Sequence, residues 1–222
     1  MDRLTDLIGG GSSASPARAD GLVYAVGDIH GCTNLMESLL ENILSDVLRE
    51  QSRREDQTPP PVIFLGDVID RGPDSAGTLE YLMAITEWPE ISPVFILGNH
   101  EAMLLEFLAD PVTGRRWLNH GGLETLISYG LSRLGDLGDP AERTRIARDL
   151  KVFMGPHLAF LETFVPVHRS GNLWFVHAGA DPNLPMEVQP ADTLIWGARD
   201  FHKIRRKDDS WIVHGHNIVE QP

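Results

Sequence analysis

Five short apolar runs in this chain each end in an aspartate, asparagine or histidine that stands beside a glycine. These side chains offer carboxylate oxygen, amide oxygen and imidazole nitrogen, the ligands that divalent metals such as Mn²⁺, Fe²⁺ and Zn²⁺ bind in proteins. One such junction could arise by chance, but five of them predict a metal site. The candidate ligands collected from the junctions are Asp28, His30, Asp67, Asn99, His177 and His216.

This set of ligands is large enough for two divalent ions that share one carboxylate. Asp28 and His30 lie two positions apart on one loop and could hold the first ion. Asp67 follows the run that we expect to form the central strand, so it is the natural bridge between the ions. No thiolate accompanies the set, which favours a catalytic centre over structural zinc. The second ion would take the remaining ligands, Asn99, His177 and His216.

Two divalent ions make hydroxide available near neutral pH and polarise the oxygens of a phosphoryl group, which predicts hydrolysis of a phosphate ester. That reaction also needs a proton donor for the leaving oxygen. His100 follows Asn99 but is not counted as a ligand, and we expect it to be this acid, oriented and kept protonated by Asp70. Arg71 could hold the phosphate through two parallel hydrogen bonds.

Parallel strands must bring these residues together. The run Val62–Leu65 is apolar and mostly β-branched or aromatic, which predicts a strand buried on both faces. Runs 22–26 and 93–97 predict strands beside it, and helical patterns follow each strand in a β-α-β-α-β order. Ligands at the carboxyl ends of such strands lie where open α/β sheets bind their substrates. The expected helices run from about 33 to 53, from 74 to about 87, and onward from Asn99.

Apolar residues at helical spacing predict which helix faces are buried. In the first helix they are Leu35, Leu39, Leu40, Ile43, Val47 and Leu48. In the helix that begins at Asn99 they are Met103, Leu104, Phe107 and Leu108.

The rest of the chain completes one α/β domain, expected over residues 21–222. Residues 113–160 hold short helical patterns broken by glycine and proline, and we expect a helical insertion over the carboxyl ends of the early strands. Runs 164–168 and 173–176 predict a β-hairpin, and a last strand ends at Val213. Residues 1–20 contain a glycine- and serine-rich stretch and are expected to form a disordered tail.

Composition limits the possible partners. The chain has 222 residues and a formal net charge of −13, which argues against general affinity for nucleic acid or for an anionic membrane. A single cysteine, Cys32, excludes an intrachain disulfide and suits a reducing cytoplasm. A phosphate substrate would have to be attracted by a local positive centre, which the metals would supply.

Three sequence blocks resemble the signature blocks of the phosphoprotein phosphatase family, within the calcineurin-like metallophosphoesterases. The bacterial and phage serine/threonine phosphatases are the most similar. This resemblance implies a four-layer α/β/β/α sandwich around a dinuclear centre, and it implies the same metal, acid and phosphate-binding roles as above. The blocks are Gly27-Asp28-Ile29-His30-Gly31, Gly66-Asp67-Val68-Ile69-Asp70-Arg71-Gly72 and Gly98-Asn99-His100-Glu101.

Later segments extend the resemblance to about residues 22–218. His177-Ala178-Gly179 and Gly215-His216 resemble the last two metal blocks, and Trp117–Tyr129 resembles the family's Trp-Asn-Gly-Gly helix. The family implies that Arg71, Asn99 and Arg199 contact the substrate phosphate. The residue Arg199 stands one place later than the family's Trp-x-Arg pattern puts it.

Three points stay open at this stage. His214 is expected to be a neighbour of the site, and His120 could approach it through the Gly121-Gly122 segment. The family's terminal strand and turn are absent after His216, so we expect a truncated C-terminus that leaves an exposed edge.

The sequence therefore predicts a metal-dependent phosphomonoester hydrolase, a serine/threonine protein phosphatase that acts on phosphoproteins or small phosphoesters. Its cofactor would be two divalent ions, with Mn²⁺ preferred and iron or zinc as alternatives. One alternative is a symmetrical dinucleoside-tetraphosphate hydrolase, although the Asp70-Arg71 pair favours the protein phosphatase. Another alternative is a non-catalytic binding module that retains the fold.

Overall fold

The computed structural model of the protein describes residues 15–53 and 55–218. Its first sheet contains three parallel strands in the order β1 (Tyr24–Val26), β2 (Pro61–Phe64) and β3 (Ser92–Phe95). Val26 pairs with Phe64, which pairs with Phe95, so the three strands end at the same level. The loops that follow them therefore leave the sheet together at one edge.

A second sheet packs on the first. It consists of β4 (His168–Ser170), antiparallel to β5 (Leu173–Val176), and β6 (Trp211–His214), parallel to β5. Ile63, Leu65 and Ile96 of the first sheet region meet Phe175 of the second in a small apolar core. This core joins the two sheets face to face.

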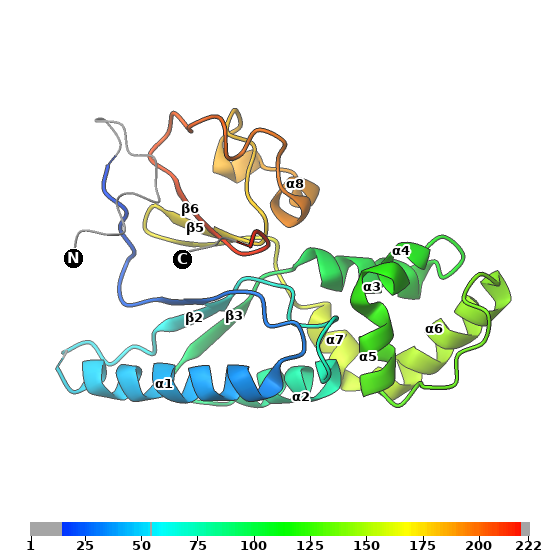
Figure 1. Cartoon of the computed structure of the whole chain (residues 1–222). Coiled ribbons are helices and arrows are strands. Elements are labelled where there is room, and N and C mark those ends of the chain that lie inside the picture. Colours follow the sequence, from blue (N-terminus) through cyan, green and yellow to red (C-terminus); the bar gives the residue numbers. More distant parts are fainter. Residues whose placement is uncertain (1–14, 54, 219–222) are drawn as a thin grey trace.

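Helices cover the outer faces of the two sheets (Figure 1). The helices α1 (Thr33–Gln51) and α2 (Ser75–Ile85) lie on the first sheet, and α8 (Ala191–Trp196) lies outside the second with a short turn, η2 (Met186–Val188). The layers are thus helix, sheet, sheet and helix, and the predicted α/β/β/α sandwich is confirmed. None of the helices in the described part of the chain combines the length and apolarity needed to cross a membrane.

Further helices extend from one end of the sandwich (Figure 1). After α3 (Asn99–Ala109), the segment expected as a helical insertion contains no strand among its residues, all of which are described. A wide turn within it, η1, departs from helical geometry at His120 and Gly121. The elements of this segment are α4 (Arg115–Trp117), η1 (Leu118–Gly122), α5 (Leu123–Ser128), α6 (Pro140–Met154) and α7 (Pro156–Leu161).

The predicted buried face of α1 is partly wrong. Leu40, Ile43 and Val47 are buried as expected, together with Met36. The other three predicted positions face solvent: Leu35 is 74% exposed, Leu39 43% and Leu48 52%. The sheet covers only one stripe of α1, and the apolar residues of this helix extend beyond that stripe. In α3, by contrast, Met103, Leu104, Phe107 and Leu108 are all buried as predicted.

The hairpin is shorter than predicted, because its first strand begins at His168 rather than at Phe164. Val165 instead joins the first sheet, where it accepts a hydrogen bond from the amide of Leu97 (2.8 Å) and donates one to the carbonyl of Phe95 (3.0 Å). The segment before β4 therefore ties the two sheets together.

The N-terminal segment differs in part from the disordered tail expected over residues 1–20. Residues 1–14 lie outside the described residues. In the described remainder, the amide of Arg18 donates to Oδ1 of Asn172 (2.7 Å), and the amide of Gly171 donates to Oδ2 of Asp20 (2.7 Å). Residues 15–20 thus lie along the turn between β4 and β5.

Candidate active site

The loops at the ends of the strands are held in strained conformations. Among the described residues, every non-glycine residue with a positive φ is one of the predicted site residues. Such a conformation costs on the order of 1–3 kcal/mol for each residue and persists only where the surroundings impose it. The residues are His30 (47°), Asp67 (52°), Asp70 (71°), Arg71 (65°) and His216 (63°).

Gly66 lets the loop after β2 approach the start of α3. Its φ is +94°, and a Cβ atom there would lie 2.7 Å from the backbone of Gly98 and 2.8 Å from Nδ1 of His177. No larger residue fits this position. The glycine before the predicted bridging carboxylate is therefore explained by close packing of three site loops.

Asp67 and His177 form the centre of the site. Three predicted ligand atoms surround Nε2 of His177: Oδ1 of Asn99 at 2.8 Å, Nδ1 of His216 at 3.1 Å and Oδ2 of Asp67 at 3.3 Å. Nδ1 of His177 donates to the carbonyl of Leu65 (2.7 Å), so Nε2 presents a lone pair to this group. A cluster of oxygen and nitrogen lone pairs of this kind is one that a cation stabilises.

The pKa shifts of Asp67 and His177 agree with a site that favours positive charge. Burial alone would raise the pKa of Asp67, but the hydrogen bond to His177 and the charges of His177 and His100 outweigh it and lower that pKa to about 2. Burial alone would lower the pKa of His177, but its hydrogen bond to Asp67 and the charge of Asp67 raise it. Each group of the pair thus favours the charged form of the other.

A second group lies on the other side of Asp67. His30 donates its Nδ1–H to the carbonyl of Ile69 (2.9 Å), and its Nε2 lies 3.8 Å from Oδ2 of Asp67. Nε2 of His100 lies 3.9 Å from the same oxygen. Burial lowers the pKa of His30, which favours the neutral imidazole that a metal binds.

Arg71 lies against this second group. Its guanidinium donates to Nε2 of His30 (3.1 Å) and to Nε2 of His100 (3.0 Å). Its own amide donates to the carbonyl of Gly121 in the insertion (3.1 Å). The arginine predicted to bind phosphate thus lies between the predicted first-metal ligand and the predicted acid.

Asp70 is fully buried and orients His100. Oδ2 of Asp70 lies 2.8 Å from Nδ1 of His100, and its two oxygens also accept bonds from the indole of Trp117 (2.9 Å) and the hydroxyl of Thr125 (2.6 Å). Burial raises the pKa of Asp70, and these hydrogen bonds oppose the rise. Two of the three donors come from the insertion, so this segment completes the site.

Glu101 is a site residue to which the sequence analysis gave no role. Its buried carboxylate accepts bonds from the amides of Gly98 (3.0 Å), Asp67 (2.9 Å), Val68 (2.9 Å) and Ile69 (3.3 Å). Those amides belong to the two loops that follow β2 and β3. Its position in the first turn of α3, just after Asn99-His100, was the available signal, because a glutamate there can reach back to free amides.

Asp28 lies beside the site rather than within either group. It is exposed, and its Oδ1 accepts a bond from the amide of His216 (3.1 Å). This contact joins the first predicted metal loop to the last. His214 lies on β6 against Phe201, with ring centroids 5.0 Å apart, and its place as a neighbour of the site stays a prediction.

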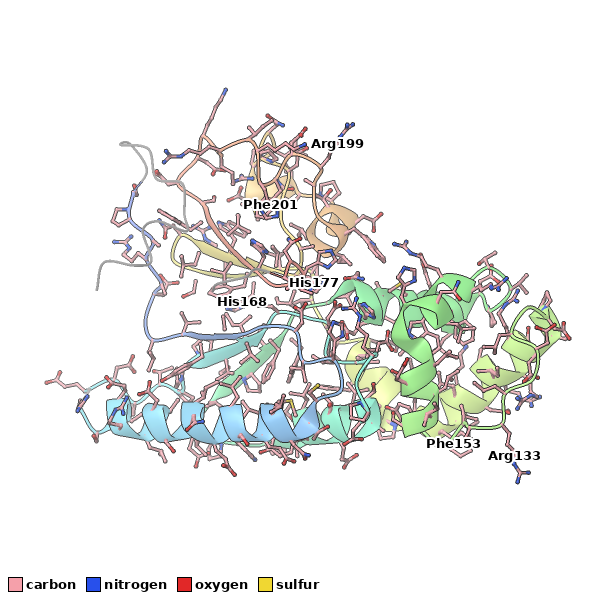
Figure 2. All side chains as sticks on the ribbon, viewed as in Figure 1. Arg133, Phe153, His168, His177, Arg199 and Phe201 are labelled. Carbon is pink, nitrogen blue, oxygen red and sulfur yellow. The ribbon has the colours of Figure 1, made fainter. Side chains whose placement is uncertain are left out.

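Arg199 is the predicted site residue that the structure does not bring to the others. It is exposed and points away from His177 (Figure 2). His120 is also exposed; its Nδ1 lies 2.7 Å from the carbonyl of Arg116 and it does not enter the metal groups.

The residues present fit a pair of divalent metals. Two groups of side chains share Asp67, and in each group the possible ligand atoms all lie within 4.8 Å of one another. The donors are imidazole and carboxylate, the set that suits Mn²⁺, Fe²⁺ or Zn²⁺. One group is His30, Asp67 and His100, and the other is Asp67, His177 and His216.

The model of the calcineurin-like phosphoesterase family matches residues 21–220. The chain therefore belongs to this family of metallophosphoesterases, whose members use divalent metals. The superfamily expected from the sequence is confirmed. The finer type, a bacterial or phage serine/threonine phosphatase, is not what the named relatives are.

Curated relatives carry a different specific name. A protein of Nitrosospira multiformis is 27% identical over 87% of this chain and 60% of its own length, and one of Methylococcus capsulatus is 28% identical over 72% and 44%. Both are named symmetrical bis(5'-nucleosyl)-tetraphosphatases. The chain spans about half the length of these relatives.

A solved structure shares the fold. A protein provisionally named a diadenosine tetraphosphatase aligns with a TM-score of 0.54, at 21% identity, over 92% of this chain and 78% of that one.

Proposed function

We propose that this chain hydrolyses dinucleoside tetraphosphates symmetrically, with release of two nucleoside diphosphates. The observation that carries the proposal is the similarity to symmetrical bis(5'-nucleosyl)-tetraphosphatases over most of the chain. The serine/threonine protein phosphatase expected from the sequence becomes the second candidate. The proposal keeps the same chemistry, attack of water on phosphorus, and changes only the leaving group.

The proposed ligands are those predicted from the sequence. His30 and Asp67 with Asp28 would hold one ion, and Asp67 would bridge to a second. When bound, the two ions supply hydroxide near neutral pH and neutralise the phosphate oxygens. Mn²⁺ is the proposed native ion. The second ion would be held by Asp67, Asn99, His177 and His216.

The chain's own side chains would complete the reaction. Arg71 lies between His30 and His100, where its guanidinium can bind the oxygens of the phosphoryl group under attack. Hydroxide adds to one of the two central phosphorus atoms, and the oxygen that bridges them leaves with the other nucleoside diphosphate. When Arg71 turns from His100 to the phosphate, Nε2 of His100 would be free to carry a proton and to give it to that leaving oxygen. Asp70 would hold the ring in place through Nδ1.

One observation favours the second candidate. The buried pair of His100 and Asp70 is a well-supported proton donor, at 2.8 Å, and serine alkoxide needs a proton far more than a nucleoside diphosphate does. A phosphoserine peptide is therefore the substrate to compare.

The test measures kcat/KM for diadenosine tetraphosphate, a phosphoserine peptide and p-nitrophenyl phosphate, each with Mn²⁺, Zn²⁺, Mg²⁺ or a chelator. We expect the tetraphosphate to be the best substrate, in a reaction that the chelator abolishes. Preference for the peptide would favour the second candidate. Loss of all three activities in every metal would support the binding module.

A further inference from the structure

One pair of side chains outside the proposed metal centre connects the insertion with the outer layer of the sandwich. The guanidinium carbon of Arg116, in α4, lies 4.0 Å from the centroid of the Trp196 ring, at the end of α8. The helix α8 belongs to the outer layer of the sandwich, and α4 belongs to the insertion (Figure 1). Arg116 is exposed and Trp196 is half-buried, so a ligand can reach the pair.

Both partners are anchored to loops of the site. Trp117, next to Arg116, donates its indole N–H to Asp70. The carbonyl of Leu194, two residues before Trp196, accepts a hydrogen bond from the amide of Ala178 (2.8 Å). Ala178 directly follows His177. The pair is therefore connected on both sides, through neighbouring residues, to loops of the proposed metal centre.

Stacking prepares Arg116 to bind an anion. A guanidinium held over the face of an indole ring is attracted to the ring and loses less conformational freedom when it forms hydrogen bonds. In the described part of the chain, no carboxylate forms an ion pair with Arg116. Its charge is thus available, in a protein with a net charge of −13.

A cavity of about 350 Å³ adjoins Arg116, between α3 and the start of α4. This volume falls in the range of small-molecule sites. Its exposed lining includes Ala109 and Thr113, and Glu106 and Asp110 add carboxylates. Carboxylates suit the amino group of a nucleobase.

We infer that Arg116, held on Trp196, binds a phosphate of the nucleoside diphosphate half that lies toward the insertion, with the nucleoside in the adjoining cavity. This inference rests on the proposed function. A tetraphosphate extends beyond the metals and Arg71, and the expected second phosphate contact, Arg199, points away. Arg116 would therefore distinguish a dinucleoside tetraphosphate from a small phosphomonoester.

The test compares Arg116→Ala with Arg115→Ala, a neighbouring exposed arginine in the same helix. The quantity measured is the ratio of kcat/KM for diadenosine tetraphosphate to kcat/KM for p-nitrophenyl phosphate. We expect this ratio to fall about tenfold or more in Arg116→Ala, as for loss of a hydrogen bond from a charged group, and to stay near the wild-type value in Arg115→Ala. Trp196→Leu should lower the ratio less, because it removes only the stacking surface.

The outcomes separate this inference from the proposed function. If the wild-type protein hydrolyses the tetraphosphate and Arg116→Ala leaves the ratio unchanged, the inference alone is wrong. If the wild-type protein does not hydrolyse it, the proposed function is wrong. The affinity for ADP, measured by calorimetry on the wild type and on Arg116→Ala, then tests the inference. Weaker binding of ADP by Arg116→Ala would support it, and equal binding would overturn it.

Discussion

Nε1 of Trp117 lies 2.9 Å from Oδ2 of Asp70, and this hydrogen bond joins two residues that are 47 positions apart in the chain. Both side chains are fully buried. Asp70 in turn contacts His100, so a tryptophan in the insertion supports the proposed acid through one intermediate carboxylate. The insertion is therefore part of the site and not an addition to its surface.

Replacement of Trp117 by phenylalanine tests this support. The change keeps most of the apolar volume but removes one hydrogen bond to a buried carboxylate, so we expect a loss of about 1–3 kcal/mol in the free energy of unfolding and a lower kcat. Chemical denaturation and steady-state kinetics measure the two effects. Trp88→Phe, which changes an indole packed on Tyr81, is the control. Equal behaviour of the two variants would contradict the role of Trp117.

Glu101→Gln tests how the site loops are held. Four backbone N–H groups donate to the Glu101 carboxylate. A glutamine side chain would turn its own N–H₂ group toward some of them, and those backbone donors would lose their acceptor. We expect a loss of roughly 3 kcal/mol in the free energy of unfolding, together with weaker metal binding. Glu106→Gln, on the exposed side of the same helix, should change neither. A Glu101→Gln protein as stable as the wild type would rule out this role.

Asp67→Asn tests the proposed bridge. Because both groups of possible ligands contain Asp67, the variant should bind both ions more weakly. Loss of a residue that only hydrogen-bonds to a ligand lowers metal affinity roughly 10–100-fold, and loss of the bridging ligand itself should lower it further. His30→Asn should weaken only one ion. Metal analysis of the purified proteins measures this difference. Two tightly bound ions and full activity in Asp67→Asn would refute the bridge.

His100→Asn separates the acid from the ligands. The variant should keep its metals and lose roughly 10²–10⁴ in kcat on a phosphoserine peptide, the usual contribution of a general acid. The loss should be smaller for p-nitrophenyl phosphate and for diadenosine tetraphosphate, whose leaving groups need a proton less. An equal loss on all three substrates, or loss of a metal, would show that His100 has another role.

Much of this site could be predicted from the sequence, because the strand ends and the ligands are local features. A buried strand followed by glycine and a polar residue identifies its own carboxyl edge, and parallel strands bring such edges together. The predicted ligands Asp67, Asn99, His177 and His216 do converge, and Asp70 does contact His100.

What could not be predicted depends on contacts between distant segments. Helical spacing showed that α1 is amphipathic, but only packing on the sheet decides that Met36 is buried and Leu35 is not. Nothing local shows that the amides of two loops converge on Glu101, or that Arg199 points outward while Arg116 lies on Trp196.

The most direct measurement of the central claim is the identity of the products from diadenosine tetraphosphate. The reaction is run with Mn²⁺ in water labelled with heavy oxygen, and the nucleotides are separated and weighed by mass spectrometry. Symmetrical attack by water predicts that ADP is the sole nucleotide product. One of the two ADP molecules from each substrate molecule should carry the label, and it should keep the label when the metal is chelated. Formation of AMP and ATP, or unlabelled ADP, or no reaction at all, would contradict the account.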